Sequence, residues 1–337
     1  MLESLGSPIA EVLSFLKPSE VVALETVSKT FQEILNKNTG FLVMGFEQYT
    51  GLSVKATNFK SYKAAVRSNY TFLHESGVLY TFCCEINFLY EIQVQTKTLK
   101  KQDLSYDFKM SRLLCECMLP GKQLFILGEE RLNQGVSKCY ILSIDTLGVE
   151  ECPSLASTAF CCVYWGQYVY AFGEITEGGF SDSCYRFSLV KKEWEGVSGP
   201  PNSYSKQSDA LILPNPLSRT SCVAFLNEIL VTSVHCSQVF SYLPYEDSWK
   251  LKMDHKSKYK AFVKAFDSAL LISDPSHFKI NNNSIERFAT DKLFTLKTGS
   301  HSILFDDKVY YLDYYSNLVS YDPTNNKFER VNLVIQV

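Results

Sequence analysis

The first 35 residues carry apolar side chains at the spacing of a helix. Ile9, Val12 and Leu16 recur at steps of three and four residues, which places them on one helical face. The helix ends before Pro18, because the residue that precedes a proline is pushed out of the helical region. The same period returns in residues 19–35, so the pattern predicts a group of short helices rather than one long helix.

The hydrophobic period changes from helical to alternating at about residue 70, where a repeat begins. Each of six units opens with a strand, turns at a small or polar residue, and returns as a strongly apolar strand. Successive turns are about 40 to 60 residues apart, close to the length of a four-stranded propeller blade. The turns fall at Gly77, Gly121, Gly166, Asn227, Asp267 and Asp307.

Together these patterns predict a mainly β protein in three parts. A small all-α domain occupies residues 1–40, and a linker over 41–70 contains a segment of helical spacing at 59–68. A six-bladed β-propeller occupies residues 71–337. A segment of about 40 residues rarely builds a core of its own, so the helices need either the propeller or another protein to cover them.

A second landmark recurs in most units, where a large apolar side chain is followed seven positions later by another across a polar turn. This spacing predicts a hairpin whose facing side chains pack one blade against the next, and units two and five lack a clear pair. The pairs are Ile92 and Leu99, Phe187 and Trp194, Tyr242 and Trp249, and Tyr321 and Phe328.

The last residues, Val331–Val337, also have the composition of a strand. We expect this strand or its neighbour to pair with the first blade, which would remove an open sheet edge and close the ring.

Over residues 75–337 the pattern resembles the kelch repeat, in which an apolar strand ends in Gly-Gly and Tyr-Asp-Pro-x-x-x-x-Trp follows. Tyr321-Asp322-Pro323 matches the second part, with Phe328 at the position of the tryptophan. The Gly-Gly pair is absent, because Gly128 and Gly173 are followed by glutamate and the last three units keep no glycine there. The resemblance implies a divergent kelch-like propeller, and a WD-type propeller is the alternative.

The N-terminal segment resembles an F-box, whose pattern includes Leu-Pro near its start, a central Pro and a later Val-x-Lys-x-Trp. Gly6 replaces the first Pro, Pro8 replaces an acidic residue, and Phe31 replaces the Trp. The positions in register with the F-box pattern are Leu5, Ile9, Val12, Leu16, Pro18, Leu24, Val27, Lys29 and Phe31.

This resemblance implies that the helices bind a Skp-type adaptor and, through it, a cullin, while the propeller binds a protein substrate for ubiquitination. The alternative is a kelch-like interaction scaffold whose helices dock on its own propeller and which has no link to ubiquitination.

Two surface features are candidates for substrate binding. Residues 198–218 form an extended loop rich in Pro, Ser and Asn between units three and four, and a tolerated insertion is the alternative. Lys256, Lys258 and Lys260 would lie on one side of a strand and could bind an acidic or phosphorylated segment. A solvated edge strand protected by lysines is the alternative for these three residues.

Composition and charge narrow the other classes of function. A net charge of −3 does not favour nucleic acid or an anionic membrane, and no apolar run reaches the length of a spanning helix. The 11 Cys are odd in number and irregular in spacing, which favours a reducing compartment, the cytoplasm or the nucleus. The five His show no metal-ligand spacing, and no nucleophile or phosphate-binding motif is present. We therefore expect no catalytic residues, no metal and no cofactor.

Overall fold

The computed structural model describes most of the chain from residue 77 onward and a few residues before it. In the N-terminal part the described residues are all helical: Glu33, Leu35, Asn36, Thr39, Leu42 and Lys60. From 77 onward the description omits residues 84–86, 131–134, 160, 177–178, 200–219, 226, 234–237, 255–257, 265–268, 275–276, 282–283, 289–301, 313–316, 323, 326 and 337.

The described residues form six sheets of four strands each, which we call blades 1 to 6. Blade 1 contains β1 (Val78–Cys83), β2 (Phe88–Gln93), β3 (Thr98–Asp103) and β24 (Val334–Gln336). Blade 2 contains β4 (Met110–Leu119), β5 (Gln123–Glu130), β6 (Ser137–Ser143) and β7 (Val149–Leu155). Blade 3 contains β8 (Cys161–Trp165), β9 (Tyr168–Thr176), β10 (Gly179–Ser188) and β11 (Glu193–Val197).

The other three blades complete the ring. Blade 4 contains β12 (Thr220–Phe225), β13 (Glu228–Ser233), β14 (Gln238–Leu243) and β15 (Ser248–Asp254). Blade 5 contains β16 (Lys258–Lys264), β17 (Ala269–Asp274), β18 (His277–Ile280) and β19 (Ile285–Phe288). Blade 6 contains β20 (Ile303–Phe305), β21 (Lys308–Leu312), β22 (Leu318–Asp322) and β23 (Lys327–Val331).

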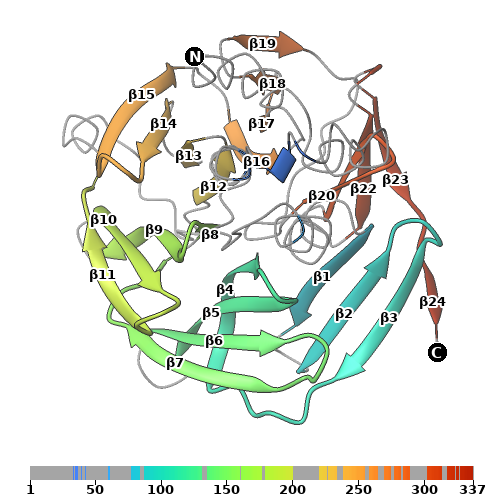
Figure 1. Ribbon diagram of the computed structural model, residues 1–337, viewed down its shortest axis with the longest axis horizontal. Coiled ribbons are helices and arrows are strands. Elements are labelled where there is room, and N and C mark those ends of the chain that lie inside the picture. The colour runs from blue at the N-terminus through green and yellow to red at the C-terminus, as the bar shows by residue number, and fades with distance from the viewer. Residues whose placement is uncertain are drawn as a thin grey trace.

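In blades 2 to 6 the four strands follow chain order from one edge of the sheet to the other, each antiparallel to the next. Figure 1 shows the sheets arranged around a common centre, with β4, β8, β12 and β16 on the inner side. This is a six-bladed β-propeller, and the predicted mainly β fold is confirmed. Among the described residues, no helix is long and apolar enough to cross a membrane.

The pairs spaced seven residues apart lie directly opposite each other in neighbouring antiparallel strands, which are β2 and β3 in blade 1 and the third and fourth strands in blades 3, 4 and 6. The rings of the aromatic pairs are in contact, with centroid separations of 5.1 Å for Phe187 and Trp194 and 5.0 Å for Tyr242 and Trp249. The predicted hairpins are therefore confirmed. One detail was wrong, because unit two keeps the spacing with the aliphatic pair Leu142 and Val149.

Each of these pairs continues onto the strand that precedes it in the chain, which is β1 in blade 1 and the second strand in the other blades. The same row of three apolar side chains therefore occurs six times. The shorter hairpin of blade 5 explains why its pair escaped the seven-residue pattern, because its members are five positions apart. The rows are Leu79–Ile92–Leu99, Leu124–Leu142–Val149, Val169–Phe187–Trp194, Ile229–Tyr242–Trp249, Ala269–Ile280–Ile285 and Val309–Tyr321–Phe328.

The rows pack each blade against its neighbour. Phe125 of blade 2 lies 5.5 Å from Phe187 and 6.2 Å from Trp194 of blade 3, between ring centroids. In the same way Phe172 of blade 3 contacts Trp249 of blade 4 at 5.8 Å. Aromatic pairs at these separations add stability beyond the area that they bury. The sequence therefore repeats one packing solution around the ring.

In these rows, Leu79 of β1 takes the place that a second-strand residue takes in the other blades. β1 therefore corresponds to a second strand, and no described residue forms an innermost strand in blade 1. Its inner edge is instead met by Glu116, a buried residue of β4 in the next blade. The Glu116 carboxylate accepts hydrogen bonds from the Phe82 backbone N–H and the Thr81 hydroxyl, both at 2.9 Å. A buried carboxylate is tolerated here because both oxygens have donors.

The ring closes where blade 6 meets blade 1, as the sequence predicted. β24 pairs with β3 along the outer edge of blade 1, but it runs parallel to β3. Figure 1 shows β24 outside β3, beside the C-terminus. Leu318 of blade 6 packs with Leu79 and Ile92 of blade 1 in one buried cluster. Gly77 is required beside this cluster, because its φ of 68° favours glycine and an added Cβ would lie 2.7 Å from the Phe305 ring.

Two nested deletions test this closure. Removing residues 334–337 breaks the β3–β24 ladder while sparing the cluster, since Val334 and Ile335 are mostly exposed. We expect a loss of about 1–2 kcal/mol of unfolding free energy from the lost backbone hydrogen bonds. Removing 331–337 also takes Val331 and Leu333 from the cluster, so the loss should be larger. Unchanged thermal melting of the longer deletion would contradict this mode of closure.

Candidate functional site

The N-terminal helical residues meet the propeller between blades 2 and 3. Leu35 and Leu42 are 0% and 6% exposed and belong to the hydrophobic cluster that these two blades share. Their separation of seven residues corresponds to two helical turns, so both side chains lie on one face. Thr39 lies between them and is buried, and its hydroxyl donates to the backbone carbonyl of Leu35 at 3.2 Å. This part of the chain therefore packs against the propeller.

The docking residues are distinct from the F-box positions. Leu35 belongs to the third predicted helical segment and Leu42 to the predicted linker, whereas the F-box register ends at Phe31. The nine F-box positions lie outside the described residues, and so does Lys256. Their predicted roles therefore stay predictions.

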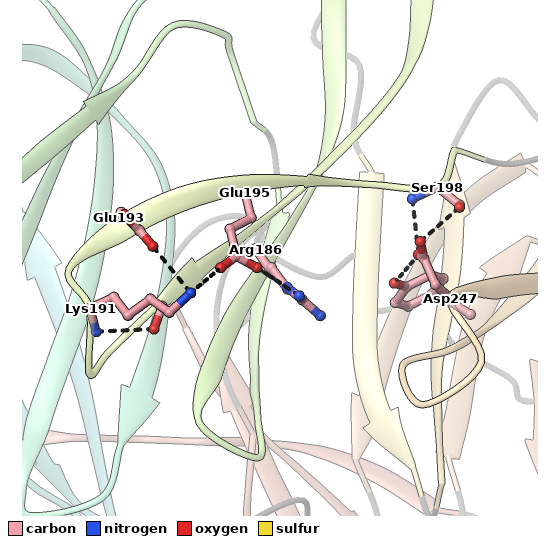
Figure 2. A network of polar contacts seen from close by, with 8 residues as sticks. Arg186, Lys191, Glu193, Glu195, Ser198 and Asp247 are labelled. Atoms are coloured by element: carbon pink, nitrogen blue, oxygen red, sulfur yellow. Dashed lines mark hydrogen bonds and ion pairs between the residues drawn. The ribbon is translucent and has the colours of Figure 1, made fainter.

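On the propeller, the structure fixes the base of the long connection between β11 and β12. Ser198, the residue after β11, donates its backbone N–H to Asp247 at 3.0 Å and its hydroxyl at 2.9 Å. Trp249 donates its indole N–H to the Ser198 carbonyl at 2.7 Å. Figure 2 shows Ser198 and Asp247 facing each other across the junction of blades 3 and 4. The connection therefore begins from an anchored residue.

The tryptophan contact is a repeated device. Trp194 of blade 3 donates its indole N–H to the Pro153 carbonyl of blade 2 at 2.8 Å, as Trp249 does to Ser198 one blade further on. The carboxylate of Asp247 is an addition at the second junction. It lies in the β14–β15 turn and has a φ of 46°, a backbone region in which aspartate is one of the better tolerated residues.

The charge state of Asp247 is set by its donors. The Tyr242 hydroxyl donates to this carboxylate at 2.6 Å, and this bond together with those from Ser198 holds the Asp247 pKa below its ordinary value. Burial and the neighbouring carboxylate raise the pKa of Tyr242, so the phenol keeps its proton and remains a donor. The cluster is thus a single anionic carboxylate with three hydrogen-bond donors.

A second polar group lies beside it on the hairpin of β10 and β11 (Figure 2). The Arg186 guanidinium donates to Glu195 at 2.7 Å and stacks 4.5 Å from the centre of the Tyr168 ring. Lys191 reaches the other oxygen of Glu195 at 3.3 Å and also pairs with Glu193 at 3.4 Å. Arg186 and Lys191 together lower the pKa of Glu195. These contacts hold the hairpin that leads into Ser198.

The predicted lysine patch falls on β16, the strand at the inner edge of blade 5. Lys258 and Lys260 both belong to it, and the Lys258 backbone lies opposite Asp274 of β17 in the ladder. The register shifts between Lys258 and Ala261, so regular alternation does not extend through Lys260. β16 is an edge strand, and both substrate binding and edge protection by these lysines stay predictions.

Cysteines gather on the first strands of blades 2, 3 and 4. Cys161 and Cys162 are adjacent in β8 and face different blade junctions, as the alternation of a strand predicts. Cys115 and Cys117 of β4 are buried, and both contact Cys162. Burial raises the pKa of Cys115 to about 11. Among the residues described, no group of three or more His, Cys, Asp or Glu could hold a metal ion.

The contact between Ser198 and Asp247 was not predicted from the sequence. Its only local signal is an acidic residue two positions before Trp249, and nothing in the chain marks Ser198 as its partner. The side chains of this junction hydrogen-bond to one another and to the start of a loop, and they therefore position that loop.

Comparison of the chain with models of known protein families and with curated proteins found no match in either. The class that the structure defines is a six-bladed β-propeller, a fold that commonly serves as a scaffold for protein interactions.

Asp247→Asn tests the anchor of the long connection. The pKa of Asp247 is lowered in the folded protein, so its stabilisation is complete above the ordinary value of 3.8 and is lost as pH falls through the folded pKa. We expect the variant to lose about 1 kcal/mol near neutral pH, since the site is partly screened by solvent. The difference from the unmodified chain should shrink in acid.

Thermal melts at several pH values measure this difference. Glu246→Gln is the matched control, because Glu246 occupies the same turn and its partners Ser248 and Lys250 lie on the same hairpin. A difference that stays constant with pH, or an equal effect of the control, would contradict the assigned role of Asp247.

Proposed function

We propose that the protein is the substrate-recognition subunit of a Skp–cullin–F-box ubiquitin ligase, with a divergent kelch-like propeller. The N-terminal helices bind the Skp-type adaptor and, through it, a cullin. The propeller binds the protein substrate. The observation that carries the proposal is the joint register of nine F-box positions between Leu5 and Phe31, directly ahead of a propeller.

The separation between docking and F-box positions supports this proposal. Leu35 and Leu42 pack on blades 2 and 3, and neither belongs to the F-box register. The proposed Skp-binding stripe at Leu16, Val27 and Phe31 is thus made of other side chains than Leu35 and Leu42. A helical segment attached to the propeller would also hold the two binding functions at a fixed separation.

A fixed separation is what the proposed mechanism needs. The protein performs no chemistry itself, and it raises the effective concentration of a substrate lysine near the charged ubiquitin carrier. The ligase operates in the cytoplasm or the nucleus. The nine free cysteines among the described residues suit such a reducing compartment.

The connection between β11 and β12 is the foremost candidate for substrate contact. Recognition residues on propellers are commonly carried by loops that a rigid scaffold positions. Hydrogen bonds from Ser198 to Asp247 fix one end of this connection. The lysines of β16 are the second candidate, and an acidic or phosphorylated segment is the partner that suits them.

A scaffold without a link to ubiquitination is the second candidate function. The burial of Leu35 and Leu42 against the propeller favours it, because some of the helical segment is covered without any partner. In that case the apolar stripe from Leu16 to Phe31 would serve internal packing as well.

Alanine substitution separates the two functions. Leu16→Ala, Val27→Ala and Phe31→Ala should each abolish recovery of a Skp-type adaptor and a cullin from a eukaryotic extract, with no change in propeller melting. Glu25→Ala is the matched control, because Glu25 lies between two apolar positions and outside the stripe. It should recover both partners.

The docking residues give the opposite pattern. Leu35→Ala should lower the melting temperature, with a loss of about 2–5 kcal/mol typical of a buried leucine, and should retain the adaptor. If the Leu16, Val27 and Phe31 variants instead lose stability, and the unmodified chain recovers neither partner, the scaffold is the correct function.

A further inference from the structure

Two buried cysteines face each other across the last two strands of blade 2. Cys139 of β6 and Cys152 of β7 are direct partners in the antiparallel ladder. Residues opposite each other in such a ladder have Cα atoms about 4.5–5.5 Å apart, within the range of about 4.4–6.8 Å that a disulfide spans. Both are free thiols, 0% and 5% exposed, and they hydrogen-bond to each other. The ladder register therefore places the two residues within the Cα range that a disulfide can span.

The two thiols have unequal environments. The hydrogen bond with Cys139, aided by the positive charge of Lys192, lowers the pKa of Cys152 despite burial and the nearby Glu150 and Glu151. Burial and the same hydrogen bond raise the pKa of Cys139. Lys192 is held in place by an ion pair with Glu150 at 2.9 Å. Ionisation is thus favoured at Cys152 over Cys139, and the thiolate is the reactive form of cysteine.

The position of Cys152 in the fold allows a small oxidant to approach. β7 is the outermost strand of its sheet, and Glu151 and Pro153 on either side of Cys152 are exposed. The ladder is irregular beyond this pair, and Pro153 has no backbone N–H, so no hydrogen bond from it is lost when β7 moves. β7 can therefore shift toward β6 as a disulfide forms. By contrast, Cys115, Cys161 and Cys162 lie on first strands at the inner edges of their sheets.

We propose that Cys139 and Cys152 form a reversible cross-strand disulfide when the protein meets a hydroperoxide. The Cys152 thiolate attacks the peroxide oxygen, the O–O bond breaks, and a sulfenic acid forms while the leaving oxygen takes up a proton. The Cys139 sulfur then attacks the Cys152 sulfur, the S–O bond breaks, and water leaves with the proton of Cys139. The two sulfurs give up two electrons to one peroxide, and a low-molecular-weight thiol restores both thiols by exchange.

This disulfide would act at a blade junction. The Pro153 carbonyl, next to Cys152, accepts the indole hydrogen bond of Trp194 from blade 3 at 2.8 Å. A disulfide that draws β7 toward β6 therefore moves a strand that takes part in the contact between blades 2 and 3. Both sulfurs stay inside the same apolar cluster after oxidation, so no polar group is left buried without a partner.

The experiment uses the full chain, reduced and then freed of reductant, with one equivalent of hydrogen peroxide. Alkylation of the remaining thiols in denaturant, digestion and mass spectrometry should find the cross-linked peptide of Cys139 and Cys152 as the main product. Cys152 should be modified at least about tenfold faster than Cys161, whose pKa is raised by burial.

Two single variants and one control sharpen the result. Cys139→Ser should leave Cys152 as a sulfenic acid that a carbon nucleophile traps, and Cys152→Ser should leave Cys139 unmodified. Cys161→Ser is the matched control, because Cys161 also contacts a second thiol, Cys222, and it should still yield the cross-link. Absence of the 139–152 cross-link in the folded unmodified chain, or modification of Cys152 no faster than that of Cys161, would overturn the proposal.

Discussion

Everything in this protein depends on covering the two apolar faces of each sheet. A four-stranded sheet of this kind is not stable alone, and its large side chains leave water only when another sheet packs on each side. The row Ile229–Tyr242–Trp249 gives the clearest case, because Phe172 of the preceding blade packs on its rings at 5.8 and 6.1 Å. Because the row occurs in all six sheets, every apolar sheet face is covered only when the sheets form a closed ring.

The closed ring then determines where function can lie. The rows fill the space between neighbouring blades. Sequence variation that creates a binding site is therefore left to the strand connections and to the segments that pack on the outside of the ring. The connection after β11 begins at Ser198, which Asp247 and Trp249 hold from the next blade. Leu35 and Leu42 bring the helical segment to the junction of blades 2 and 3. The proposed ligase function uses both of these attachments.

Much of the fold could be predicted because its signals are local. A turn residue such as Gly121, followed by an apolar strand, marks each unit, and the pair Tyr321 and Phe328 faces across a hairpin close to it in sequence. The pair of unit two was missed because Leu142 and Val149 are aliphatic, and the seven-residue spacing is more conspicuous for aromatic pairs such as Phe187 and Trp194. The closing strand was expected from its composition, but composition carries no information on the parallel direction of β24.

The parts that could not be predicted join residues distant in sequence. Glu116 meets Thr81 and Phe82 from another blade, and Asp247 meets Ser198 from another blade. Cys139 and Cys152 share a hairpin, yet their pairing depends on a register that the irregularity beside Cys139 resets. Each of these contacts depends on how blades or strands come together, and a single sequence records that only indirectly.

The most direct test of the central claim is hydrogen exchange of the full chain, measured alone and with a purified Skp-type adaptor. We expect the adaptor to slow exchange in residues 5–31 and to leave the propeller and the docked segment around Leu35 and Leu42 unaffected. Protection confined to the propeller, or no protection in residues 5–31 at saturating adaptor, would contradict the proposed ligase subunit.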